Sequence, residues 1–162
     1  MNLSTLELIK TYPVVDVPLE SPVYRAFQQL YMNADARYRG ILVENCYCLW
    51  LSRLHDNPLW VMDPYSPVDI ELPDCFIDVK STGEEKGSRS FTAKPRQAEF
   101  IAPAGKPLYF VLVTIEKWDN KNAVITLRAH HVSVLSDQRL VHLPPLEGAT
   151  KFMSEYRGGR YV

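Results

Sequence analysis

Two aspartates, Asp69 and Asp78, stand in a segment where apolar and charged residues alternate, residues 68–82 (VDIELPDCFIDVKST). This period of two, interrupted by one Pro-Asp pair, predicts a β-hairpin with an apolar face and a charged face. If the loop keeps Leu72 opposite Cys75, the two aspartates lie directly across from each other. Two carboxylates then share one place on the charged face.

Carboxylates so placed repel each other, because the Cβ atoms of directly opposite residues are about 5 Å apart. A divalent cation would neutralise them, and Mg²⁺ sites often combine one or two carboxylates with other oxygens and several waters. We therefore expect Mg²⁺, or Mn²⁺ in its place, at Asp69, Asp78 and the carbonyl oxygen of Val79. Lys80 would point to the same face and reach a water or a phosphate oxygen. The alternative is an ordinary hairpin with a solvated charged face.

The context of the aspartate-x-lysine triplet matters more than the triplet itself. An acidic residue two positions before a lysine also occurs at residues 84–86 and 119–121, and average composition yields about one such triplet in a chain of this size. Those two triplets lie in polar, turn-like stretches. Only residues 78–80 lie in an apolar strand that follows an acidic one, and this marks them as the candidate site.

Composition indicates an ordinary globular protein of one domain. The chain has 162 residues, of which 46% are hydrophobic and 23% charged, and its formal net charge is −1. This charge excludes a global basic field, so any binding of nucleic acid must be local. The three cysteines show no zinc-type pairing, and no apolar run is long enough for a membrane span. These features predict a cytoplasmic protein with free thiols and no membrane partner.

Hydrophobic periodicity predicts alternating helices and strands in a single domain over residues 1–162. Residues 14–19 are expected to be an extended link, and the chain after Asp137 is expected to be irregular, ending in a basic tail. The N-terminal helices fall within 4–34, and the C-terminal strand and tail within 116–162. The predicted helices cover residues 4–12, 21–33, 35–54 and 94–101, and the predicted strands 59–62, 68–72, 75–80, 108–115 and 123–135.

Two further sets of residues are candidates for the site. Glu44 lies among apolar neighbours on the third predicted helix, where it either completes the acidic cluster or simply faces solvent. The stretch from Lys80 to Arg96 has five basic side chains against two acidic ones, a net charge of +3. Its cations are candidates for contacts with backbone phosphates: Lys86, Arg89, Lys94 and Arg96.

A pair of adjacent histidines, His130 and His131, lies in the last predicted strand. Neighbouring residues of a regular strand face opposite sides of the sheet. The two imidazoles are therefore not expected to bind one metal ion, and we interpret them as structural.

The order of these elements resembles the core of the PD-(D/E)XK nuclease superfamily, which includes restriction endonucleases and Holliday-junction resolvases. A helix with Glu44 is followed by a strand with Asp69, a strand with Asp78-Val79-Lys80, a helix and a buried strand. The similarity covers roughly residues 35–115. It implies a restriction-endonuclease-like α/β sandwich, in which a central mixed β-sheet is flanked by helices.

The resemblance also implies roles for individual residues. Asp69 and Asp78 would bind the metal ion, Lys80 would position the attacking water, and Glu44 would complete the site from the first core helix. Lys94 and Gln97 fall where such enzymes carry polar, substrate-facing residues on the second core helix. The spacing between the aspartates is shorter than usual, and aspartate replaces the commoner glutamate at position 78. These departures are compatible with a member that has lost catalysis.

These observations predict a Mg²⁺-dependent nuclease that hydrolyses phosphodiester bonds, with DNA favoured over RNA. A homodimer or a larger protein complex is compatible with this prediction. Two alternatives belong to other classes of protein. One is a catalytically inactive nuclease-fold module for nucleic-acid binding or assembly, and the other is an interaction protein with no role in nucleic-acid metabolism.

Overall fold

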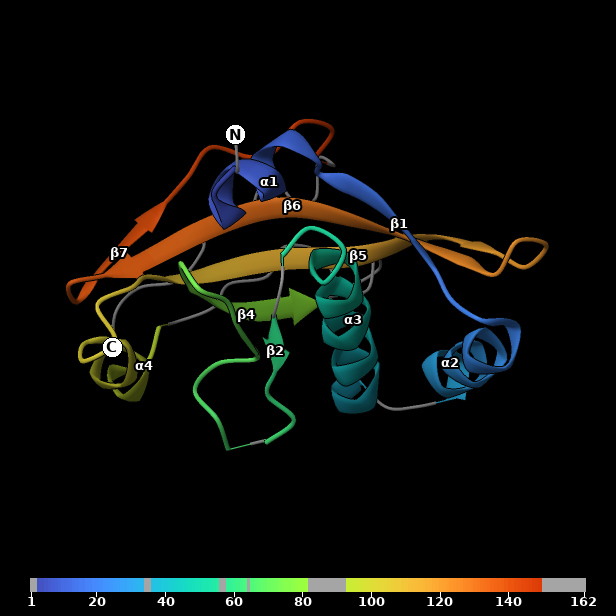
Figure 1. The fold of residues 1–162 in the computed structure, drawn as a ribbon, viewed down its shortest axis with the longest axis horizontal. Helices are drawn as coiled ribbons and strands as arrows, with labels where there is room; N and C mark the ends of the chain where they lie inside the picture. The colour runs from blue at the N-terminus through green and yellow to red at the C-terminus, as the bar shows by residue number, and fades with distance from the viewer. Residues whose placement is uncertain (1–2, 34–35, 56–57, 64, 82–92, 150–162) are drawn as a thin grey trace.

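The computed structural model describes residues 3–33, 36–55, 58–63, 65–81 and 93–149, and these form a mixed α/β fold around one sheet (Figure 1). Their four helices are α1 (Thr5–Thr11), α2 (Ser21–Asn33), α3 (Ala36–Leu51) and α4 (Pro95–Ile101). None of these helices is long and apolar enough to cross a membrane.

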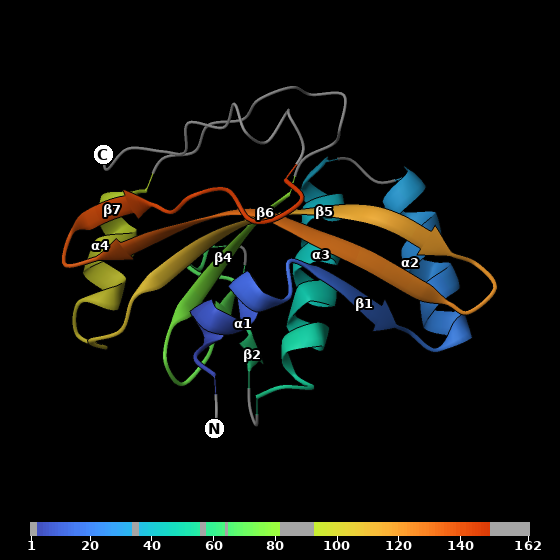
Figure 2. The same cartoon turned by 90° about the horizontal axis from the view of Figure 1, so that it is seen from above.

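The sheet has seven strands, and all but one of its pairings are antiparallel. The strand order is β1-β6-β5-β4-β3-β2, with β7 also paired to β6, and β4 runs parallel to β5. The long strands curve across the molecule, with α4 near one end and α2 near the other (Figures 1 and 2). The strands are β1 (Val14–Pro18), β2 (Leu59–Trp60), β3 (Ile70–Glu71), β4 (Phe76–Ser81), β5 (Leu108–Asp119), β6 (Val124–Ser136) and β7 (Arg139–His142).

Local signals place three of the helices correctly. The predicted capping box of α1 is present, because the Ser4 hydroxyl accepts from the Glu7 N–H and the Glu7 carboxylate accepts from the Ser4 N–H. The predicted starts of α2 and α4, each with a proline in the first turn, are also confirmed.

Two predicted irregular segments are strands of the sheet instead. Residues 14–18, expected to be a link, form β1 and pair with β6, and residues 139–142 form β7. Both strands are short and partly exposed, so their polar and proline residues weaken the alternation that identifies a strand from sequence.

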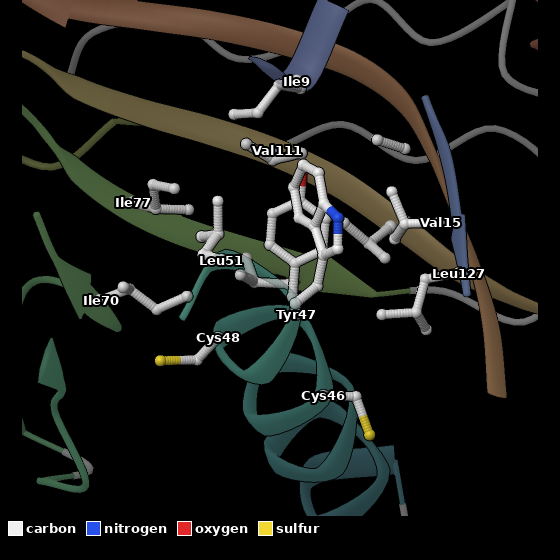
Figure 3. Packing of buried hydrophobic residues seen from close by; sticks show 14 of the residues in the cluster. Ile9, Val15, Cys46, Tyr47, Cys48, Leu51, Ile70, Ile77, Val111 and Leu127 are labelled. Atoms are coloured by element: carbon white, nitrogen blue, oxygen red, sulfur yellow. The ribbon is translucent and has the colours of Figure 1, made fainter. Parts of the chain in front are cut away.

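The apolar core divides into two clusters, to which alternate residues of β5 contribute. Tyr109 and Val111 pack with α1 and α3, whereas Phe110 and Leu112 pack with α4. In Figure 3, Tyr47 and Leu51 of α3 lie among apolar side chains of the strands. The site described below is held between these two clusters.

The buried face of α3 differs from the predicted one. The apolar spacing that predicts this helix includes Ile41, Cys46 and Leu49. Cys46 is buried as that spacing predicts, but Ile41 and Leu49 are exposed, and the buried face also contains Val43, Tyr47 and Leu51. The helix also ends at Leu51 rather than Leu54. Because the sequence from Ile41 to Leu51 is apolar on nearly every side, its periodicity does not identify the face that meets the sheet.

The predicted register of the hairpin is confirmed at Ile70 and Glu71 but does not continue to a pairing of Asp69 with Asp78, and the charged face is covered at Asp78. Ile70 pairs with Ile77, and the Leu72 N–H donates to the Cys75 carbonyl at 2.9 Å. Asp78, on β4, is only 7% exposed. The expected open, charged face is therefore covered at Asp78, which removes the interpretation of that residue as a surface charge.

The two histidines do not face opposite sides of the sheet as predicted, because β6 bulges at His130. Leu112 pairs with His131 and Val113 with Ala129, which leaves His130 as an extra residue in the ladder. Its Nε2 lies 2.8 Å from the hydroxyl of Thr114, two residues beyond Leu112. Both imidazoles therefore lie on the face of Leu112, although both are buried, as expected for structural histidines.

Candidate functional site

The site begins where β3 separates from β4, at Asp69. The Asp69 N–H donates to the Ile77 carbonyl at 2.9 Å, although Ile70 is the residue paired with Ile77, so the ladder becomes irregular here. The Asp69 carboxylate instead accepts from the Val79 N–H at 2.8 Å. Since the N–H and C=O of one strand residue point to the same side, the Val79 carbonyl also faces Asp69.

Asp78 lies on the neighbouring strand and is held at both oxygens. Its Oδ1 is 3.2 Å from the Nζ of Lys80, which is partly exposed. Its Oδ2 accepts a hydrogen bond of 2.9 Å from the Nε2 of Gln97. The lysine side chain thus connects a buried carboxylate to the surface.

Gln97 positions Asp78, in contrast to the substrate-facing role that the resemblance implies for it. Its side chain is buried, and its Oε1 accepts from the Lys94 N–H at 2.8 Å, which closes the first turn of α4. Its Nε2 donates to Pro67 O at 3.0 Å as well as to Asp78. One amide therefore fixes the start of α4, the chain before β3 and the Asp78 carboxylate.

Glu44 of α3 joins the same cluster and is half-buried. Its Oε1 accepts from the indole Nε1 of Trp60 at 3.1 Å, and its carboxyl is also hydrogen-bonded to Asp69. Burial raises the pKa of Glu44 and the charge of Asp78 raises it further, whereas the hydrogen bonds and the charge of Lys80 lower it. The alternative of a freely solvated glutamate is therefore wrong.

Within this cluster, the pKa of Asp69 is strongly raised. Burial, followed by the negative charges of Asp78 and Glu44, raises the pKa of Asp69 to about 8, against the lowering effects of the Val79 N–H and Lys80. The raised pKa favours the protonated form of the Asp69 carboxyl when no cation is bound. A proton on Asp69 removes the negative charge that a bound metal ion would otherwise neutralise.

The donor atoms suit Mg²⁺ better than a metal that needs many protein ligands. Among the residues that the structure describes, no three Asp, Glu, His or Cys side chains form a group that could hold a metal ion. Mg²⁺ commonly binds one or two carboxylates and completes its shell with waters. Asp69, Asp78 and the Val79 carbonyl satisfy that requirement.

The predicted substrate-binding residues separate into three groups. Lys94 and Arg96 are exposed at the start of α4, and Arg96 also donates to Tyr65 O at 3.2 Å. Gln97 is buried, as described above. Lys86 and Arg89 lie outside the described residues.

Sequence reasoning missed Trp60, which orients Glu44. Trp60 belongs to a predicted strand, but neither its spacing nor its neighbours connect it with an acidic residue. The one available signal is general, since a partly buried indole N–H usually requires a hydrogen-bond acceptor.

Comparison with protein-family models, curated proteins and solved structures finds no match for this chain. The functional argument therefore rests on the geometry of the cluster formed by Glu44, Asp69, Asp78 and Lys80.

Proposed function

We propose that this protein is a Mg²⁺-dependent nuclease that hydrolyses phosphodiester bonds, with DNA as its favoured substrate. Its core would be a restriction-endonuclease-like sandwich of the PD-(D/E)XK type. One observation carries the proposal: the buried carboxyl of Asp69 interacts with the charges of Asp78 and Glu44, and the ammonium group of Lys80 lies 3.2 Å from Asp78. The raised pKa of Asp69 fits a site that is completed by a cation.

In this proposal some residues bind the metal ion, and Lys80 orients the attacking water. Asp69, Asp78 and the Val79 carbonyl would hold the ion, with Glu44 binding its water shell or a second ion. When bound there, Mg²⁺ would lower the pKa of a water and neutralise charge on the phosphate. Lys80 would donate hydrogen bonds to that water and to a phosphate oxygen, since a lysine ammonium has three donors and no acceptor.

The reaction is a hydrolysis at phosphorus. The water oxygen forms a bond to phosphorus while a bridging P–O bond breaks. One water proton goes to the leaving oxygen, and the other stays on the product phosphate. Lys80 stabilises the phosphate charge through this step, and Asp78, 3.2 Å away, fixes the position of its ammonium group.

The direct test is cleavage of DNA by the purified protein. We expect nicking or cutting of plasmid and oligonucleotide substrates with Mg²⁺ or Mn²⁺, no reaction with EDTA, and no reaction by Asp69→Asn. The matched control is Asp16→Asn, a substitution of an aspartate of β1 whose carboxylate accepts from Thr126 at 2.7 Å. Cleavage that persists in EDTA, or that proceeds in Asp69→Asn at the rate of the Asp16→Asn control, contradicts the proposal.

A second candidate is an inactive nuclease-fold module that binds nucleic acid or takes part in assembly. It is favoured by the closed hydrogen bonding around Asp78, whose two carboxylate oxygens are already engaged by Lys80 and Gln97. Nucleic-acid binding without metal-dependent cleavage would select this candidate.

A further inference from the structure

A strongly exposed tyrosine lies beside the candidate site, in the segment that connects β2 and β3. Tyr65 is 83% exposed, and Met62 in the same segment is 73% exposed. Figure 1 shows this segment projecting away from the sheet, between α4 and α3. Single exposed apolar residues are common, so the argument depends on how Tyr65 is held and on what surrounds it.

The backbone of Tyr65 is fixed although its ring is in solvent. Asp63 Oδ1 accepts from the Tyr65 N–H at 2.9 Å, and Asp63 O accepts from the Ser66 N–H at 3.0 Å. The Ser66 hydroxyl in turn accepts from the Val68 N–H at 3.2 Å. A ring presented on an ordered backbone loses less conformational entropy on binding than one on a loose loop.

The start of α4 ties this segment to the acidic cluster. Arg96 donates to Tyr65 O at 3.2 Å, and the Gln97 amide donates to both Pro67 O at 3.0 Å and Asp78 Oδ2 at 2.9 Å. Tyr65 and Pro67 are two residues apart, a span of at most about 7 Å. One nucleic-acid strand covers that length in about two nucleotides, at about 3.4 Å each.

Two exposed cations beside the segment can contact a polyanion, against one exposed acidic residue, Asp63, in the turn itself. Lys94 and Arg96 are exposed beside the segment, and Lys80 reaches the surface from the cluster. A fixed aromatic ring with neighbouring cations is the combination that binds single strands, because bases stack on the ring while phosphates meet the charges.

We propose that Tyr65 is a stacking platform for an unpaired base of the substrate strand, with Lys94 and Arg96 contacting its phosphates. This inference rests on the proposed function and narrows its substrate class. A base can cover the ring only when it is outside a duplex. The favoured substrate is therefore single-stranded or locally unpaired DNA.

The test measures binding without cleavage. Fluorescence anisotropy in EDTA compares one labelled 12-nucleotide strand with the duplex of the same sequence. Tyr65→Ala should weaken binding to the single strand by about 5- to 150-fold, with a much smaller effect on the duplex, whereas Tyr65→Phe should keep wild-type affinity. Tyr12→Ala is the matched control, since Tyr12 is a half-exposed tyrosine at the end of α1. Lys94→Gln should reduce the salt slope of single-strand binding by about 0.7.

The outcomes separate this inference from the nuclease proposal. The platform is overturned if Tyr65→Ala binds the single strand with wild-type affinity, or if it loses affinity equally for strand and duplex. Either result leaves the nuclease proposal intact. Binding that depends on Tyr65 without any metal-dependent cleavage keeps the platform and rejects the nuclease. Failure of the wild-type protein to bind either DNA overturns the platform.

Discussion

When protonated, the carboxyl group of Asp69 has one hydrogen-bond donor and one acceptor, as a side-chain amide does. Its raised pKa favours the protonated form, which can donate to Glu44 while it accepts from Val79. Asp69→Asn provides the same donor and acceptor without the charge. We expect this variant to match or exceed the wild-type Tm in EDTA and to lose the Tm increase that Mg²⁺ gives the wild type, since a ligand stabilises only the state it binds.

Asp78→Asn is the contrasting variant, although repulsion between two facing carboxylates would by itself raise the metal-free Tm of both variants. The structure separates them, because Asp78→Asn loses the pairing with Lys80 and brings a second amide against Gln97. Differential scanning calorimetry should therefore show a lower Tm for Asp78→Asn in EDTA. Equal destabilisation by both variants, with and without Mg²⁺, would make these aspartates structural hydrogen-bonding groups.

Lys80 offers a test that separates catalysis from metal binding. Lys80→Ala should reduce cleavage by at least about 100-fold while Mn²⁺ affinity, measured by electron paramagnetic resonance, stays close to wild type. The reason is that a protonated lysine has no lone pair for the ion. The matched control is Lys106→Ala, which removes another lysine paired with an acidic residue, Glu71. A wild-type cleavage rate in Lys80→Ala would make Lys80 a surface charge.

Trp60 donates a hydrogen bond to Glu44, and a double-mutant cycle tests whether its effect on the site passes through that contact. Trp60→Phe keeps an aromatic ring but removes the donor to Glu44, so Mn²⁺ affinity should fall several-fold. In a Glu44→Gln background the same substitution should change nothing further. Trp118→Phe, a change in a tryptophan that packs on Tyr24, is the control. Additive losses would show that Trp60 contributes by packing rather than by orienting Glu44.

At the scale of elements, local chemistry predicts more than long-range packing does. The capping box of α1 and the hairpin register follow from neighbouring residues and are confirmed. The buried face of α3 is set by the strands that it packs against. Because α3 is apolar on most sides, its hydrophobic periodicity does not identify that face. The bulge at His130 is likewise invisible, because it arises from how β5 and β6 align over more than ten residues.

That bulge gives the protein a sensitivity to acid. Burial, together with the nearby charge of Arg128, lowers the pKa of His130 to about 4, against an opposing effect of Glu116. Between pH 6.5 and 4 the unfolded chain therefore binds a proton here that the folded protein does not. The associated stability, up to about 3 kcal/mol, is present above pH 6.5 and is lost as the pH falls towards 4.

Urea denaturation between pH 4.5 and 7.5 measures this effect. His130→Gln should show a flatter decline in unfolding free energy with falling pH than the wild type, whatever its absolute stability. His55→Gln is the control at another histidine. Parallel pH profiles for wild type and His130→Gln would assign the acid sensitivity to other groups.

At the scale of the whole molecule, the cluster could be assembled from sequence but its surroundings could not. Glu44, Asp69, Asp78 and Lys80 were all predicted together, because strand alternation and the order of elements bring them to one place. Gln97 was assigned to the substrate rather than to Asp78, and Trp60 was missed. Both depend on side-chain contacts between elements that are distant in sequence.

If the protein binds DNA as proposed, its charge balance predicts how that binding depends on salt. With a net charge of −1, attraction must come from the few cations near the site rather than from a global field. Three to five phosphate contacts correspond to a slope of log K against log salt of about −2 to −4.5. Anisotropy titrations at several salt concentrations check this value. A slope near −10 would reveal an extended cationic surface instead.

The hydrogen bond between Trp60 and Glu44 also gives the protein an optical probe of its own site. Of the three tryptophans, Trp50 and Trp118 pack against tyrosine rings, whereas Trp60 donates its N–H to a carboxyl that would face the cation. Indole emission depends on the charge and hydrogen bonding around that N–H. With Trp50 and Trp118 replaced by phenylalanine, the wavelength of the Trp60 emission maximum would report directly on cation binding to the acidic cluster, without a label or a substrate.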